Sequence, residues 1–151
     1  MNEVFSMIPA PAKTLWFVGS IAALIAAVVC VLVFVAYSAR HTHFEVSPEG
    51  LRISGDFFGR LIAAESLIPD RARLVDLAAA PELRPRWRTM GSGLPGYQSG
   101  WFRLRNREKA LVYLTDRSRV VFIPTSLGYS LLLSIEQPEL FLEALSRAVP
   151  R

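Results

Sequence analysis

The stretch that decides the fold is residues 97–135, YQSGWFRLRNREKALVYLTDRSRVVFIPTSLGYSLLLSI. Four short segments within it have the apolar, β-branched and aromatic composition of strands: 97–104, 110–115, 120–124 and 129–135. Charged turn segments separate the first three of these strands. Apolar residues occupy both faces of the strand at 110–115, as expected where a sheet is covered on both sides. The stretch therefore predicts a mainly-β domain.

A helix is predicted directly after these strands, at 138–148. Pro138 suits the first helical position, where no N–H partner is needed, and Glu139 suits the positive end of the helix dipole. Apolar residues recur at helical spacing on one side: Phe141, Leu142, Leu145 and Val149. We expect this helix to cap an open end of the sheet.

Shorter strands are predicted before residue 97. Residues 44–46 and 51–53 alternate around the turn Pro48-Glu49-Gly50, which indicates a hairpin, and 60–63 is expected to pair with 51–54. Arg73, Val75 and Leu77 follow at strand spacing. In total we expect about seven antiparallel strands. Residues 78–96 contain three prolines and three glycines and are predicted to form a long irregular loop.

A cationic and aromatic cluster lies within that predicted loop. It consists of Arg84, Arg86, Trp87 and Arg88. Such a cluster can bind anionic lipid headgroups, and it can equally anchor a protein partner, since Arg and Trp are common at interfaces. The third interpretation is a solvated loop with the indole packed on the sheet. All three remain open at the level of sequence.

An uncharged run of 23 residues, 15–37, precedes the domain. As a helix it would be about 34 Å long, which is enough to cross a hydrocarbon core of about 30 Å. We therefore expect an amino-terminal tail at 1–14, a transmembrane helix at 15–37, and one domain from 44 to 149. A cleaved signal peptide is the alternative, because Ala36-Tyr37-Ser38 has the pattern of a cleavage site. A lipoprotein anchor at Cys30 is disfavoured, since no small residue directly precedes this cysteine.

The flanks of the apolar run suggest its orientation. Lys13 lies on the amino side, and Arg40 and Arg52 lie on the carboxyl side, so the positive-inside rule favours a cytoplasmic domain at the inner membrane. Small residues recur at four-residue spacing in the run: Gly19, Ala23 and Ala27. This stripe suits helix–helix pairing in a membrane, although alanine is common in membrane helices for other reasons.

The residues in the second half of the domain resemble a known family. The segments at 96–104, 109–116, 121–129 and 134–141 are similar to bacterial pleckstrin-homology-like (PH) domains, particularly small membrane-anchored ones. The resemblance implies a bent antiparallel sheet in two halves, capped by the carboxyl-terminal helix. It also implies a scaffolding module that associates through sheet edges, and it brings no catalytic residues. Phosphoinositide binding by eukaryotic relatives uses a basic first hairpin turn, whereas the turn at Pro48-Glu49-Gly50 is acidic.

Composition and motifs restrict the chemistry further. Residues 71–119 hold ten arginines and Lys109 against four acidic residues, within a chain of net charge +4. His41 and His43 are the only histidines, fewer than the three or four ligands of a zinc site. We expect no enzyme activity, no metal, no cofactor and no nucleic-acid partner. The expected function is protein interaction or homo-oligomeric assembly at the membrane, and the alternative is a sensor of anionic lipid.

Overall fold

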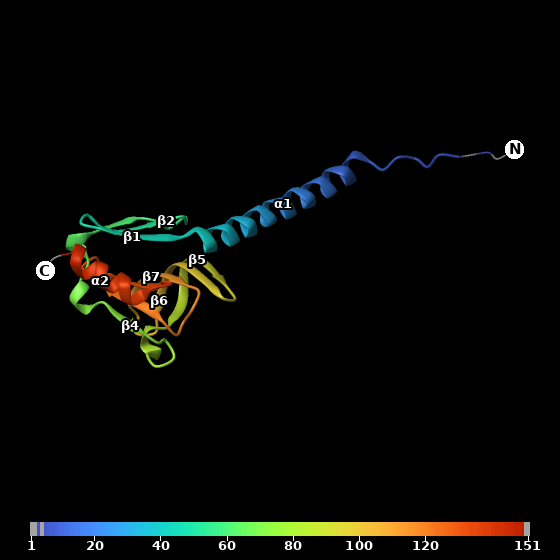
Figure 1. The fold of residues 1–151 in the computed structure, drawn as a ribbon. Helices are drawn as coiled ribbons and strands as arrows, with labels where there is room; N and C mark the ends of the chain where they lie inside the picture. Colours follow the sequence, from blue (N-terminus) through green and yellow to red (C-terminus); the bar gives the residue numbers. More distant parts are fainter. Residues whose placement is uncertain (1–2, 4, 150–151) are drawn as a thin grey trace. The chain divides into compact units, whose positions relative to one another are not determined.

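The computed structural model describes residue 3 and residues 5–149, so part of the predicted tail lies outside the described residues. The chain divides into two compact units, Met1–Tyr37 and Ser38–Arg151. Most of helix α1 (Ala12–His41) lies in the first unit, and the second unit is mainly β (Figure 1). The predicted fold class, an apolar amino-terminal helix followed by a mainly-β domain with a final helix, is confirmed.

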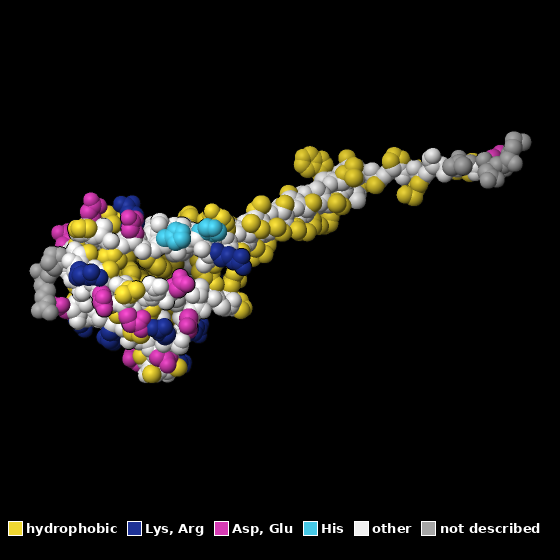
Figure 2. Space-filling model, viewed as in Figure 1, with side chains coloured by type: hydrophobic (Ala, Val, Ile, Leu, Met, Phe, Trp, Pro, Cys, Tyr) yellow, Lys and Arg dark blue, Asp and Glu magenta, His cyan; other side chains and the backbone are white. Residues whose placement is uncertain are grey.

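Helix α1 is long and apolar enough to cross a membrane. It begins after Pro11, whose carbonyl accepts a hydrogen bond from the N–H of Thr14 (2.9 Å). Apolar side chains cover the visible surface of the helix (Figure 2) and are exposed throughout the run at 15–34. Gly19, Ala23 and Ala27 are exposed residues of this helix. An exposed apolar helix of this length needs a partner other than water.

A three-stranded antiparallel sheet opens the second unit. Its strands are β1 (His43–Ser47), β2 (Gly50–Ser54) and β3 (Leu61–Ala63), in the order β1-β2-β3. The predicted hairpin and the predicted pairing of 60–63 are confirmed. Gly50 is required where the turn enters β2, because its φ is +137° and a Cβ there would lie 2.0 Å from the carbonyl oxygen of Ile62.

The second sheet has six strands in the order β4-β8-β9-β7-β6-β5. Their bounds are β4 (Arg73–Val75), β5 (Pro85–Leu94), β6 (Tyr97–Leu104), β7 (Lys109–Leu114), β8 (Val120–Pro124) and β9 (Tyr129–Ser134). The described residues thus form nine strands rather than about seven. One pair, β7 and β9, is parallel and was not expected. It arises because β8 does not pair with β7. Strand β9 lies between these two strands, antiparallel to β8 and parallel to β7.

The prediction of a long irregular loop at 78–96 was wrong. A short 3-10 turn, η3 (Pro81–Leu83), is followed by the ten-residue strand β5. The glycines that suggested a loop instead allow close approach of two strands. Gly91 lies opposite Gly100, and a Cβ on Gly91 would lie 2.1 Å from the carbonyl oxygen of Ser99. Pro85 is tolerated because it opens a strand at the sheet edge.

Both faces of the central strands of the six-stranded sheet are buried. Alternate residues of β7 point to opposite sides: Leu111 and Tyr113 enter a first core, and Ala110, Val112 and Leu114 enter a second. The first core lies between the two sheets and also holds Leu51, Ile53 and Ile62. The segment at 76–84 covers the second core with Leu77 and Leu83 as the chain passes from β4 to β5. Two other short 3-10 turns, η1 (Ala64–Ser66) and η2 (Pro69–Arg71), connect the sheets.

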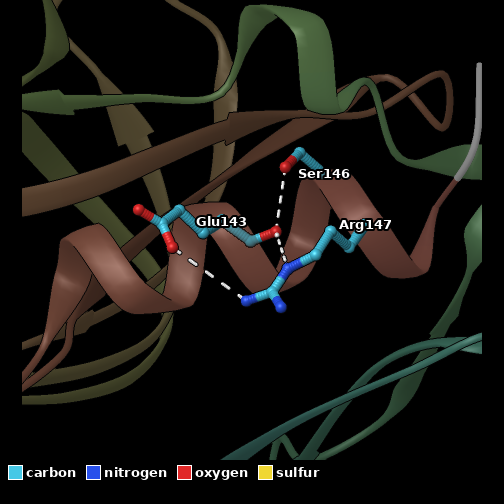
Figure 3. Close-up of polar contacts among 3 residues, drawn as sticks. All are labelled: Glu143, Ser146 and Arg147. Carbon is cyan, nitrogen blue, oxygen red and sulfur yellow. Dashed lines mark hydrogen bonds and ion pairs between the residues drawn. The ribbon is translucent and has the colours of Figure 1, made fainter.

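Helix α2 (Pro138–Ala148) closes the first core, as predicted. It packs against β1, β4 and β8, and buries Phe141, Leu145 and Val149 (Figure 1). On its solvent side, the carbonyl of Glu143 accepts hydrogen bonds from Ser146 Oγ (2.8 Å) and Arg147 Nε (3.4 Å), shown in Figure 3. Arg147 in the last turn also complements the negative end of the helix dipole.

A small polar cluster is buried beside the first core. The hydroxyls of Tyr97 and Tyr113 and one carboxylate oxygen of Asp56 have no hydrogen-bond partner among the described residues. Burial raises the pKa of Tyr113 well above its usual value, and the negative charge of Asp56 raises it further. Burial is also the main cause that raises the pKa of Tyr97. Both phenols therefore stay protonated in the folded state at pH values where an unfolded chain begins to ionise them.

Replacement of Leu145 by Ala tests the role of α2. Leu145 is 0% exposed in the first core, so L145A is expected to lower the free energy of unfolding by about 2–5 kcal/mol. Leu140 lies on the same helix but is 57% exposed, so L140A should change the free energy by less than about 0.5 kcal/mol. Denaturant titration of the full-length protein in detergent measures both. Equal losses in the two variants would show that α2 does not close the core.

The raised pKa of Tyr113 predicts a loss of stability at alkaline pH. Below the unfolded pKa of about 10, the phenol contributes its full share to the free energy of unfolding. That share is lost as the pH rises from there toward the folded pKa, by up to about 1.4 kcal/mol per pH unit. In Y113F the free energy of unfolding should fall less steeply between about pH 10 and 11.5 than in the unmodified protein. An unchanged slope in Y113F would contradict the assignment.

Candidate functional site

The exposed edge strand β5 carries the residues that the sequence singled out. Among the described residues, β5 pairs with β6 alone, so one side of its backbone is unpaired. Three of its apolar side chains are exposed: Trp87 by 62%, Met90 by 60% and Leu94 by 42%. The opposite edge strand, β4, has only three residues and is packed against α2. The long, uncovered edge of the sheet is therefore β5.

Three of the four predicted residues are brought together on this edge. Arg86, Trp87 and Arg88 are exposed on β5, and the guanidinium of Arg86 lies 5.4 Å from the centre of the Trp87 ring. They lie on a strand, not on the loop that the sequence suggested. Arg84 is separate from this group and has a structural role. Its side chain donates hydrogen bonds to the carbonyls of Leu77 and Ala78, which hold the segment over the second core.

The two halves of β5 differ. The first half has features that discourage pairing with another strand: Pro85, two exposed arginines, and register shifts between Pro85 and Trp87 and between Arg88 and Met90. At the second shift, Thr89 Oγ1 donates to the carbonyl of Trp101 (2.9 Å). The second half, from Met90 to Leu94, pairs with β6 in regular register. This half can accept a further strand through its unpaired backbone groups.

Sequence reasoning missed Met90 and Leu94 as surface residues. In the segment Met90-Gly91-Ser92-Gly93-Leu94 every second residue is a glycine, so the larger side chains lie on one face of a strand. The high glycine and proline content of the region led instead to the prediction of a loop. The turn after Leu94 is formed by Pro95 and Gly96, with a φ of +78° at Gly96, which suits a type II turn between two strands. The Pro95-Gly96 pair between two strand-like segments was therefore the sequence feature that could have predicted this hairpin.

A hollow of about 630 Å³ lies near the ends of β7 and β9, and several of its polar groups already form hydrogen bonds within the protein. Ser134 Oγ accepts hydrogen bonds from the N–H groups of Thr115 and Asp116 (both 3.1 Å) and donates to the Asp116 carbonyl (2.7 Å). The pKa of the Asp116 carboxyl is held below its usual value, mainly by a hydrogen bond from the backbone N–H of Ser118 and next by one from the Ser118 hydroxyl. This arrangement stabilises the turn between β7 and β8.

The histidines do not form a metal centre with other residues in the described part of the chain. Within residue 3 and residues 5–149, no three His, Cys, Asp or Glu side chains gather closely enough to hold a metal ion. His43 is exposed on β1.

Comparison with known proteins identifies the family. A family model described as the bacterial PH domain matches residues 42–149, which is well over half of the chain. No curated protein and no solved structure matches significantly. The matched range includes both sheets and α2, in agreement with the resemblance noted in the sequence. The chain belongs to the bacterial PH domain family.

Proposed function

We propose that this protein is a non-catalytic, membrane-anchored binding module that assembles through the β5 edge. The observation that carries the proposal is an uncovered ten-residue edge strand with three exposed apolar side chains. Helix α1, which can cross a membrane, would hold the domain at the bilayer. A bacterial PH domain is compatible with either protein or lipid binding.

Strand addition is the mode of interaction that this edge suits best. An unpaired edge offers a row of N–H and C=O groups to another chain, and main-chain hydrogen bonds then supply the affinity. Met90 and Leu94 would add apolar contacts beside those bonds. The protective features of the first half of β5 restrict addition to its second half, which gives the interface a defined register.

The partner we propose is a second copy of the same strand. Two β5 strands related by a two-fold axis at Ser92 would be antiparallel, and Met90 of one copy would lie opposite Leu94 of the other. In this register neither Arg86 nor Arg88 of one copy lies directly opposite an arginine of the other copy. A surface that pairs with itself in this way is typical of homodimers.

The location that accompanies this proposal is the inner membrane, with the domain in the cytoplasm. It is supported by Arg40 and Arg52 on the carboxyl side of the apolar run against Lys13 on the amino side.

A second candidate function is binding of an anionic bilayer by Arg86, Trp87 and Arg88. Exposure of the indole beside the guanidinium of Arg86, with Arg88 also exposed on β5, favours it, since each basic residue near an anionic surface contributes about 1 kcal/mol. The acidic hairpin turn at Pro48-Glu49-Gly50 disfavours it. The two functions depend on different residues of β5 and can be separated by substitution.

Lysine substitutions in the second half of β5 test the assembly. The double variant M90K/L94K places cations opposite each other across the proposed pair, and should weaken self-association by roughly tenfold or more. The mass of the full-length protein in detergent, measured by light scattering over a range of concentrations, gives the result. L127K is the matched control, since Leu127 is an exposed leucine in the β8–β9 turn.

Two further variants distinguish the competing contacts. G19L should leave the mass unchanged if β5 forms the interface, and should lower it if helix pairing through Gly19, Ala23 and Ala27 does. R86E/R88E should leave the mass unchanged. If the second function is correct, the same variant should also lose binding to anionic vesicles. A monomeric unmodified protein at all concentrations would contradict the proposal.

A further inference from the structure

We propose that a second surface, remote in sequence from the Met90–Leu94 segment, binds a phosphorylated small anion. The surface is a cleft of about 500 Å³. Residues that line it include Arg71, Arg103, Arg107, Glu108, Lys109 and Tyr129, and we call it the basic cleft. It is formed where η2, the β6–β7 turn and the β8–β9 turn come together.

No ion pair among the described residues neutralises the cations of the basic cleft. Four cationic side chains line it and only one carboxylate, that of Glu108, accompanies them. The ion pairs among described residues are Arg119–Glu139 and Glu143–Arg147, and neither involves a cation of the cleft. Cations held together without counter-charges repel one another, and a bound anion removes that repulsion.

The β6–β7 turn holds its arginines in an unusual backbone conformation. Arg107 has a φ of +72°, and is the one residue other than glycine with positive φ in the described part of the chain. Its N–H donates to the Leu104 carbonyl (3.0 Å), and its own carbonyl accepts a hydrogen bond from Arg103 Nη1 (3.3 Å). A left-handed conformation costs a non-glycine residue of order 1 kcal/mol or more, and such strain occurs frequently at binding sites.

Hydrogen bonds and ring contacts hold the opposite wall of the cleft. Thr125 Oγ1 donates to the carbonyl of Tyr129 (2.6 Å) and accepts from the N–H of Leu127 (3.2 Å), which closes the β8–β9 turn. The Tyr129 ring packs edge-to-face on Trp101, with 4.9 Å between ring centres. The ammonium of Lys109 lies 4.3 Å from the centre of the same indole. These contacts hold Tyr129 and Lys109 in place before a ligand binds, which reduces the side-chain entropy that these two residues lose on binding.

The chemistry of the lining points to a phosphate ester. Guanidinium groups bind phosphate oxygens through paired, charge-assisted N–H bonds, and an ammonium adds a compact positive charge. The volume of the cleft falls within the range of small-molecule sites and exceeds what a phosphate group alone would fill. A soluble phosphate ester and a phosphatidate headgroup present this same chemistry, and the experiment separates these two sources.

The test is binding by the full-length protein in detergent, followed by tryptophan fluorescence and by thermal unfolding. The soluble probes are inorganic pyrophosphate and glycerol 3-phosphate, and the lipid probe is a phosphatidate vesicle compared with a phosphatidylcholine vesicle. Saturable binding of a soluble probe assigns the site to a soluble ester, and binding of phosphatidate vesicles alone assigns it to a headgroup. Either result supports the proposal, and binding of none of these probes overturns it.

Matched substitutions locate the site. R103Q/R107Q removes two charges from the basic cleft and should weaken binding at least tenfold, while R86Q/R88Q removes two charges from β5 and should not change it. A larger or equal loss in R86Q/R88Q would overturn the assignment to the cleft. Thermal unfolding without ligand shows whether R103Q/R107Q is folded. If it is not, the single variant K109M, which keeps an apolar stem over Trp101, replaces it and should also weaken binding.

Discussion

Burial of both faces of the central strands is the constraint on which the rest of the structure depends. The side chains of β7, β8 and β9 alternate between two cores, so each face of the sheet needs a cover. The three-stranded sheet and α2 cover one face, and the segment at 76–84 covers the other. Because β4 and β5 are opposite edges of the sheet, this segment crosses the whole sheet. The chain then enters β5, the edge strand that remains uncovered.

Much of this architecture could be predicted from local patterns. The turn at Pro48-Glu49-Gly50, the apolar strands from residue 97 onward and the helical spacing of Leu145 and Val149 all led to elements that the structure contains. Strand β5 was missed because Gly91, which suggested a loop, serves a close contact with Gly100 that depends on the register of two strands. The parallel pairing of β7 with β9 likewise follows from strand order, which no short segment encodes.

The candidate surfaces also differ in how far the sequence alone could predict them. The sequence brought Arg86, Trp87 and Arg88 to attention because they are neighbours in the chain, and it included Arg84, whose side chain instead holds the segment at 76–84 in place. The basic cleft takes its cations from β6, β7, the turn between them and η2. Only folding assembles these residues, although the excess of arginine between residues 71 and 119 indicated that a basic surface would form.

Hydrogen exchange of the β5 amides in the full-length protein, at low and high protein concentration, tests the central claim most directly. If the β5 edge pairs with a second copy, amides between Met90 and Leu94 that point away from β6 will exchange more slowly at high concentration, while the exposed amides of Arg86 and Arg88 will change less. Rapid exchange of the Met90–Leu94 amides at every concentration at which the protein is oligomeric would contradict the account.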